Sequence, residues 1–187
     1  DYSGSSVSLS SDGKTVAIGA PYNDGNGNDS GHVRIYNYDG SNWTQLGFDI
    51  DGEAANDFSG RSVSLSSDGT TMAVGADYND GNGTNSGHVR VYSYFSGYWN
   101  KRGLDIDGEA ASDQSGKSVS LSSDGTILAI GADLNSVLGY GTGHVRVYQF
   151  SNDSWSQLGE DIDGEAASDQ SGYSVSLSSD GKTVAIG

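Results

Sequence analysis

The sequence of 187 residues contains no cysteine, one proline and only nine lysine and arginine residues. The lack of cysteine excludes disulfides, thiol catalysis and cysteine zinc sites. The 25 acidic residues bring the formal charge to −16, and we expect no nucleic-acid partner because phosphate binding needs a basic surface. No apolar run approaches the roughly 18 residues of a membrane span. We therefore expect no membrane insertion, and the acidic charge favours divalent cations.

Repeats organise the chain, which is rich in glycine. The phrase SVSLSSDG starts at Ser6 and recurs at positions 62, 118 and 174, so the period is 56 residues. The phrase GHVR and a tryptophan follow at the same period. A fixed period of this kind indicates one domain of stacked supersecondary units. The predicted units are residues 1–56, 57–112 and 113–168, with a partial unit at 169–187.

Each unit contains the signals of four short strands and no helical pattern. In the second unit, apolar and polar residues alternate in SVSLS, and a turn leads to TMAVGA at 71–76. A loop rich in Gly and Asn precedes a third strand at 87–94, a short strand surrounds Trp99, and a linker follows at 105–116. Four successive strands at a fixed spacing predict an all-β fold, a β-propeller of four-stranded blades. The chain would hold three blades and the first two strands of a fourth.

The wording of the repeat resembles a known family. Residues 58–76, FSGRSVSLSSDGTTMAVGA, followed by SGHVRVYSY and a tryptophan, resemble the FG-GAP repeat of integrin-α-like propellers. The FG position is Ser59 and Gly60, and the GAP triplet is intact at 19–21 but reads GAD in the next two units. The resemblance implies a propeller, commonly of seven blades, that serves adhesion or ligand recognition outside the cell. The calcium loop DxDxDG of integrin-type members is replaced here by SSDG.

The repetition predicts that the chain is not an enzyme, because an active site is normally a single constellation. No nucleophile elbow, phosphate loop or HExxH motif occurs. A carboxylate pair such as Asp49 and Asp51 recurs in every unit, which disfavours acid and base catalysis. The repeated histidines could form a three-histidine metal site, but the period places each in a different blade, so a packing or hydrogen-bonding role is preferred. These residues are His32, His88 and His144.

The linkers of the form DIDGEAAxD are the best candidates for a cation site. Alternating acids around a glycine turn offer the oxygen ligands that Ca²⁺ takes, although the spacing is not that of an EF-hand. The alternative is that these acids cap turns by accepting hydrogen bonds from backbone N–H groups. The candidate calcium ligands are Asp49, Asp51, Glu53, Asp57, Asp105, Asp107, Glu109, Asp113, Asp161, Asp163, Glu165 and Asp169.

Three further features allow two interpretations each. The loop at 79–82 could hold a cation or a sugar, but Asn and Gly are also what turns with positive φ require. Four sequons predict glycosylation if the source is a eukaryote. The repeated tryptophans are expected to anchor the packing, and exposed ones would stack on sugars. The sequons are at Asn28, Asn42, Asn82 and Asn152, and the tryptophans are Trp43, Trp99 and Trp155.

These observations and the resemblance predict an extracellular or cell-surface module with a structural or adhesive role in a surface, matrix or appendage (filament) protein. Its partners would be protein or glycan, or copies of itself in an assembly. The alternative is a multivalent carbohydrate-binding propeller. Because three and a third units cannot close a ring, we expect further blades from a longer polypeptide, or assembly of several copies.

Overall fold

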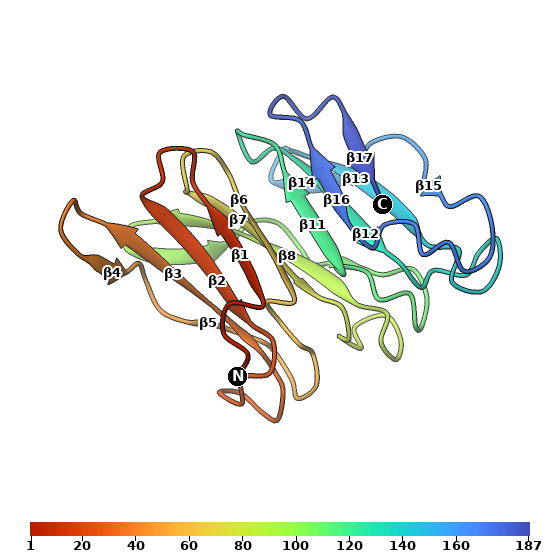
Figure 1. The fold of residues 1–187 in the computed structure, drawn as a ribbon, viewed down its shortest axis with the longest axis horizontal. Coiled ribbons are helices and arrows are strands. Elements are labelled where there is room, and N and C mark those ends of the chain that lie inside the picture. Colours follow the sequence, from red (N-terminus) through yellow and green to blue (C-terminus); the bar gives the residue numbers. More distant parts are fainter.

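The computed structural model describes residues 1–187 and consists of four β-sheets arranged side by side like the blades of a fan (Figure 1). The first sheet has the strand order β1-β2-β3-β4, and β5 also pairs with β3. No helix of the structure is long and apolar enough to cross a membrane. The strands of the first sheet are β1 (Ser6–Leu9), β2 (Thr15–Ala20), β3 (His32–Tyr38), β4 (Trp43–Gln45) and β5 (Ile50–Asp51).

The second and third sheets repeat this plan, and the fourth has two strands. The second sheet contains β6 (Ser62–Leu65), β7 (Thr71–Ala76), β8 (His88–Phe95), β9 (Tyr98–Lys101) and β10 (Ile106–Asp107). The third contains β11 (Ser118–Leu121), β12 (Ile127–Ala132), β13 (His144–Ser151), β14 (Ser154–Gln157) and β15 (Ile162–Asp163). The fourth contains β16 (Val175–Leu177) and β17 (Val184–Ile186).

The prediction of an all-β fold with sheets of four antiparallel strands is confirmed. The linker, however, adds a fifth short strand, in which Ile50 pairs with Val33 and Asp51 pairs with His32. Ile50 is buried in the core, so it holds the start of the linker against the sheet. A strand of two residues is too short to show alternation, which explains why the sequence did not reveal it.

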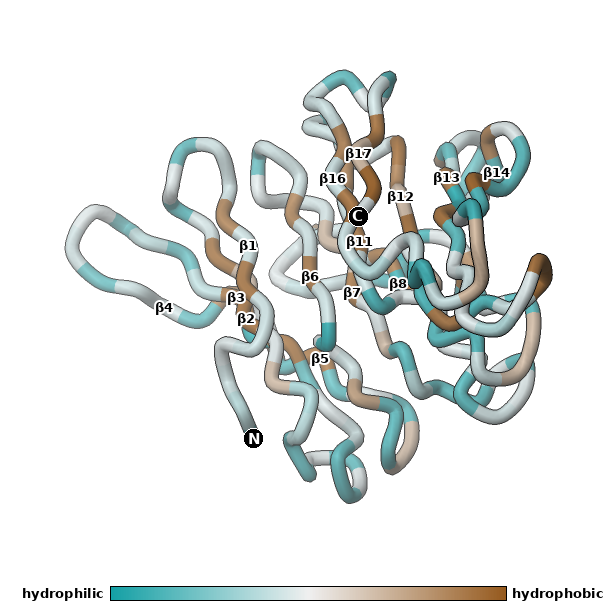
Figure 2. Tube along the Cα trace, turned by 45° about the vertical axis from the view of Figure 1, so that its right-hand side comes forward, coloured by the Kyte–Doolittle hydropathy of each residue, from teal (hydrophilic) through white to brown (hydrophobic).

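The core lies between the sheets. One hydrophobic cluster joins the first sheet to the second, and Met72 and Val74 of β7 belong to it. The other joins the second sheet to the third, and Val89 and Val91 of β8 belong to it. The second sheet is therefore buried on both faces. Figure 2 shows that the hydrophobic residues lie mainly on the strands and that most loops are hydrophilic.

Repeated hydrogen bonds fix neighbouring sheets along their first strands. The backbone N–H of Ser11 donates to the carbonyl of Ser67 at 2.9 Å, and Ser67 donates to Ser123 at the same distance. The hydroxyl of Ser8 accepts a hydrogen bond from the N–H of Leu65 at 2.9 Å. Because these contacts recur at the period of the sequence, each sheet is placed on the next in the same way.

The outer face of the first sheet carries uncovered apolar side chains. Val7 and Leu9 on β1 are 64% and 56% exposed. Their counterparts on β6, Val63 and Leu65, are 9% and 8% exposed because the first sheet covers them. The uncovered face of the first sheet thus carries the same kind of apolar side chains that are buried between the first and second sheets.

Candidate functional site

The first acid of each linker lies beside the arginine of the phrase GHVR. Nε of Arg34 is 3.0 Å from Oδ1 of Asp49, and its Nη2 is 2.8 Å from Oδ2. In the second sheet, Nε and Nη2 of Arg90 lie 2.8 and 3.0 Å from the two oxygens of Asp105. Arg90 also pairs with Glu53, which comes from the preceding linker. Acids of two successive linkers thus meet at one guanidinium.

These contacts explain the acidity of the carboxylates. Burial alone would raise the pKa of Asp105, but hydrogen bonds from Arg90 and Lys101 outweigh it and lower the pKa to about 2. The hydrogen bond from Arg34 lowers the pKa of Asp49. In the third sheet, Arg146 donates instead to the backbone carbonyl of Asp107 at 2.8 Å. The carboxylates of Asp49 and Asp105 therefore stay ionised at neutral pH, and their negative charge is already balanced by arginine and lysine side chains of the protein.

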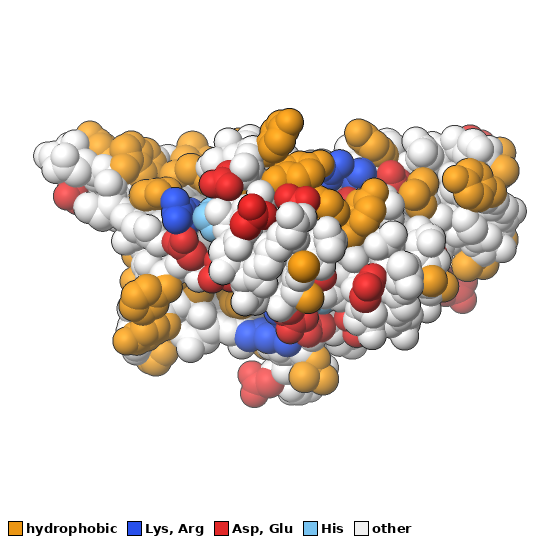
Figure 3. All heavy atoms as spheres, turned by 90° about the horizontal axis from the view of Figure 1, so that it is seen from below, with side chains coloured by type: hydrophobic (Ala, Val, Ile, Leu, Met, Phe, Trp, Pro, Cys, Tyr) orange, Lys and Arg blue, Asp and Glu red, His pale blue; other side chains and the backbone are white.

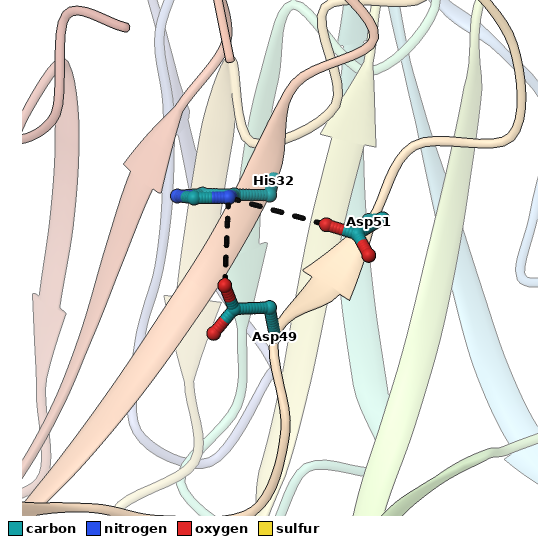
Figure 4. A group of neighbouring side chains, drawn as sticks. All are labelled: His32, Asp49 and Asp51. Carbon is teal, nitrogen blue, oxygen red and sulfur yellow. Dashed lines mark ion pairs between the residues drawn. The ribbon is translucent and has the colours of Figure 1, made fainter. Parts of the chain in front are cut away.

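Each of the three histidines lies on the third strand of its own sheet, next to linker acids. Figure 4 shows Nδ1 of His32, 3.8 Å from Oδ2 of Asp49 and 4.0 Å from Oδ1 of Asp51. The same arrangement places His88 near Asp107 and His144 near Asp161. Burial, followed by the neighbouring arginine, lowers the pKa of all three imidazoles. They are neutral at pH 7, and no two of them belong to the same cluster.

These clusters fit calcium poorly. Each one combines an imidazole with carboxylates, as in His32 with Asp49 and Asp51, whereas Ca²⁺ takes six to eight oxygen ligands. An imidazole suits a transition metal better. In the first two sheets an arginine also already binds the first linker acid, so the ligands left for an ion are few.

The last acid of each linker has a different position. Asp57 accepts a hydrogen bond from the N–H of Ala54 at 3.0 Å and another from the side chain of Asn79 at 3.0 Å. Asp113 repeats both contacts, and Asp169 accepts the N–H of Ala166 at 2.7 Å. These acids therefore cap turns, which is the alternative that the sequence left open for them.

The acids in the SSDG turns, where integrin-type members carry calcium, also act as caps. Oδ1 of Asp68 accepts hydrogen bonds from the hydroxyl of Ser66 at 2.6 Å and from the N–H of Thr70 at 3.0 Å. One acid per turn, bound in this way, forms no oxygen shell around an ion. The structure thus gives no support to calcium at the position where the family binds it.

The loops that follow the second strands lie against the linkers. The side-chain amide of Asn26 donates to the carbonyls of Gly52 and Glu53 at 2.8 and 3.0 Å, and Asn82 repeats the pair of bonds in the next unit. The amide of the predicted sequon residue Asn82 is therefore used in packing. All four sequon residues, Asn28, Asn42, Asn82 and Asn152, are exposed.

The tryptophans differ in exposure. Nε1 of Trp99 donates to the carbonyl of Leu46 at 2.9 Å, and Trp155 makes the same bond to Arg102, so both join neighbouring sheets. Trp43 has no preceding sheet against it and is 48% exposed. The two inner tryptophans are packing anchors and not free stacking platforms.

A non-repeated pocket lies between the first two sheets, and sequence reasoning missed it. Its cavity of about 110 Å³ is lined by Tyr22, Phe58, Arg61, Asp77 and Tyr78. Asp77 is completely buried, and neither of its carboxylate oxygens accepts a hydrogen bond. Burial raises its pKa to about 6. A buried carboxylate of raised pKa that lines a pocket is a candidate for a functional residue.

Two cations and one further acid surround Asp77. Nε of Arg61 is 3.5 Å and Nζ of Lys117 is 3.6 Å from Oδ2 of Asp77. Asp133, the counterpart of Asp77 in the third sheet, also raises the pKa of Asp77. The sequence did contain a signal, because GAD replaces GAP and puts an acid directly after the apolar strand predicted at 71–76.

The comparisons with known proteins agree with this architecture. The family model described as FG-GAP repeat matches residues 1–36 and 50–92. These two segments are similar to the FG-GAP repeat. The resemblance inferred from the sequence is thereby confirmed, and the comparison with curated proteins gives no match.

A solved structure with a similar fold is the crystal structure of a putative 6-phosphogluconolactonase from Bacteroides uniformis. It aligns with a TM-score of 0.65 and 15% identity, covering 97% of this chain and 46% of that one. This chain therefore spans about half the length of the solved chain. At such an identity the likeness shows the fold alone.

This comparison corrects one prediction. The repetition of the units predicts that the chain is not an enzyme, and this prediction is wrong. A similar arrangement of sheets occurs in a protein described as a putative enzyme. The pocket at Asp77 shows the physical reason. Tyr22, Phe58 and Tyr78 line it together, but Gln114 and Leu134 stand at the equivalent places in the third unit, so a repeated backbone still carries a single constellation.

Proposed function

We propose that the chain forms part of a closed β-propeller in an extracellular or cell-surface protein and has a structural or adhesive role there, contacting protein or glycan. The uncovered Val7 and Leu9 support closure, since they match side chains that lie buried between sheets further along the chain. The three and a third units of this chain cover 46% of the solved chain. A protein of that full length would hold about seven such units, within the usual four to eight blades. The FG-GAP match supports the extracellular location, because such repeats typically occur in extracellular proteins.

One observation carries the adhesive role. The loop after β12 exposes three large apolar side chains, Val137, Leu138 and Tyr140, which are 69%, 65% and 80% exposed. The first loop has Gly25, Asn26 and Asn28 at these places. Apolar side chains grouped on an exposed loop mark a contact surface.

Figure 3 views one end of the fan, where hydrophobic, acidic and basic side chains lie together. A mixture of this kind is typical of a recognition surface, in which apolar groups supply affinity and charges supply selectivity. We therefore propose that a partner contacts the loop after β12 through its exposed apolar side chains.

The first test is the location of the protein. A membrane-impermeant amine reagent applied to intact source cells should modify exposed lysines such as Lys182. Labelling only after lysis would contradict the extracellular proposal.

The second test exchanges the loop. The triple variant Val137→Gly, Leu138→Asn, Tyr140→Asn copies the first loop, so the fold should be retained. We expect at least tenfold weaker retention on cell-surface or matrix preparations that bind the native protein. Unchanged retention would contradict the role of this loop in adhesion.

The alternative of a carbohydrate-binding propeller has its own support. The inner tryptophans are used in packing, so they give no repeated sugar platform. The aromatic pocket at Asp77 offers a site instead, and it favours one saccharide site in this part of the ring over one site per blade.

A further inference from the structure

The pocket lined by Tyr22, Phe58, Arg61, Asp77 and Tyr78 combines an aromatic wall with an unsatisfied acid. We propose that it binds the hydroxyl-bearing edge of a saccharide, with Asp77 accepting hydrogen bonds from the hydroxyls and Arg61 donating to them. The proposal rests on the glycan recognition named above and assigns it to one site.

The carboxylate of Asp77 requires hydrogen-bond donors. Leaving a buried charged group without hydrogen bonds is costly, and both oxygens of Asp77 lack one. Arg61 and Lys117 lie 3.5 and 3.6 Å from the same oxygen, Oδ2, so they offset the charge without satisfying Oδ1. A ligand that brings hydroxyl donors would satisfy the carboxylate.

The aromatic side chains form a continuous row beside this acid. The ring centroids of Tyr22 and Phe58 are 5.1 Å apart, and those of Phe58 and Tyr78 are 5.0 Å apart, both in edge-to-face geometry. Rings of this kind offer apolar faces next to polar groups. A sugar matches such a wall, because the C–H groups of its ring contact the aromatic surface while its hydroxyls reach the charged side chains.

The local charges disfavour the other ligand classes. An ammonium ligand would meet the two cations Arg61 and Lys117, and an anionic ligand would meet the two acids Asp77 and Asp133. A neutral ligand with both donors and acceptors agrees with this balance. The cavity of about 110 Å³ is small, so it fits one edge of a monosaccharide and not a long chain.

The site occurs once in the chain. Gln114 and Leu134 replace Phe58 and Tyr78 in the third unit, and Pro21 replaces Asp77 in the first. Phe58 and Gln114 share a left-handed backbone, with φ of 54° and 56°. The exchange Phe58→Gln with Tyr78→Leu therefore introduces residues that the same fold already carries, and it should fold.

The experiment is calorimetric titration of the whole chain with neutral monosaccharides, after a screen on a glycan array. We expect a saccharide that binds the native chain to bind at least tenfold more weakly to the Phe58→Gln, Tyr78→Leu variant and to Asp77→Asn. The matched control is Phe95→Ala, which removes an exposed aromatic side chain outside the pocket and outside the apolar loop and should leave this affinity unchanged. The reverse exchange, Gln114→Phe with Leu134→Tyr, tests whether a second aromatic wall raises the stoichiometry, and a rise would support the proposal.

Two results would overturn the proposal. Saccharide binding that survives both pocket variants would place the glycan site elsewhere and leave the recognition function intact. An array with no bound glycan, or binding of tetramethylammonium in place of sugars, would reject the ligand class. Adhesion through the loop at 137–140 is measured separately, so its failure can be told apart from failure of the pocket.

Discussion

The α-carbon of Gly75 lies against the backbone carbonyl of Gly116, so closely that a β-carbon at Gly75 would overlap that oxygen and the hydroxyl of Ser62. Gly75 is the glycine of the GAD triplet, and the pair Gly19 and Gly60 repeats the approach. The glycine of the family motif thus allows one sheet to pack against the start of the next.

Gly75→Ala should therefore destabilise the fold strongly. The added methyl group meets backbone that is held by the hydrogen bond from Ser62 to Gly116, which is 2.7 Å long, so the sheets must separate. We expect a loss of about 3 kcal/mol in the free energy of unfolding, at the upper end for overpacking. Urea denaturation measures it.

Gly97→Ala is the matched control for this prediction. Gly97 lies in a tight turn with φ of 90° and has open space around its α-carbon. Its substitution should cost only backbone strain, about 1 kcal/mol. Equal losses at both positions would mean that the approach of Gly75 to Gly116 has no special role.

Arg90 and Arg34 occupy the same place in successive units but should differ in how much they contribute to the free energy of unfolding. The side chain of Arg90 is mostly buried and binds Asp105 and Glu53, whereas that of Arg34 is 46% exposed and pairs with Asp49. Arg90→Ala leaves Glu53 without its cation and Asp105 with Lys101 alone, so we expect a loss of about 2 kcal/mol, somewhat below a fully buried pair. Arg34→Ala should cost less than about 1 kcal/mol. Similar losses in urea denaturation would contradict a network joining two linkers.

Asp77→Asn should stabilise the unliganded protein at neutral pH. The folded pKa of Asp77, about 6, lies above the ordinary value of 3.8, so the folded state loses stability as pH rises from about 4 to 6 and does not regain it. The surrounding charges, Arg61, Lys117 and Asp133, are included in this shift. A pKa shift of this size corresponds to a loss of up to about 3 kcal/mol in the free energy of unfolding above pH 6.

The measurement is the free energy of unfolding at pH 4 and pH 7. The variant should gain most at pH 7 and little at pH 4, where the native acid is protonated. A variant that is less stable than the native protein at pH 7 would show that the pairing of Asp77 with its two cations outweighs its burial.

Much of the fold was accessible from the sequence because the repeat displays each strand three times. Alternation in SVSL and the apolar run TMAVGA identified β6 and β7, and the glycines between strands marked the turns. The two-residue strands such as β10 were missed, because pairing with β8 is set by tertiary packing of Ile106 and not by local pattern.

The site was less accessible. Sequence reasoning treated the four acids of a linker as one cluster, but the chain separates them. Asp57 caps its own turn, while Glu53 reaches Arg90 in the next sheet. The pocket at Asp77 combines positions that recur at the period, such as Tyr22 and Tyr78, with Phe58, which occurs in the second unit only. The pattern of the sequence does not show that these residues meet between two sheets, so only the structure places them together.

Calcium at the acidic linkers stays a prediction, and removal of metal tests it. Because Arg34 and Arg90 already bind Asp49 and Asp105, we expect a chelator to leave the unfolding temperature unchanged, and added Ca²⁺ to leave it unchanged as well. A rise on adding Ca²⁺ that is abolished by Asp51→Asn would assign an ion to the linker, since Asp51 lies beside His32 without an arginine contact. Asp57→Asn serves as the control: Asp57 caps a turn, so its substitution should lower stability equally with and without Ca²⁺. If the loss at Asp57 depended on calcium, the ion would instead be held by the end of the linker, and the capping role would be secondary.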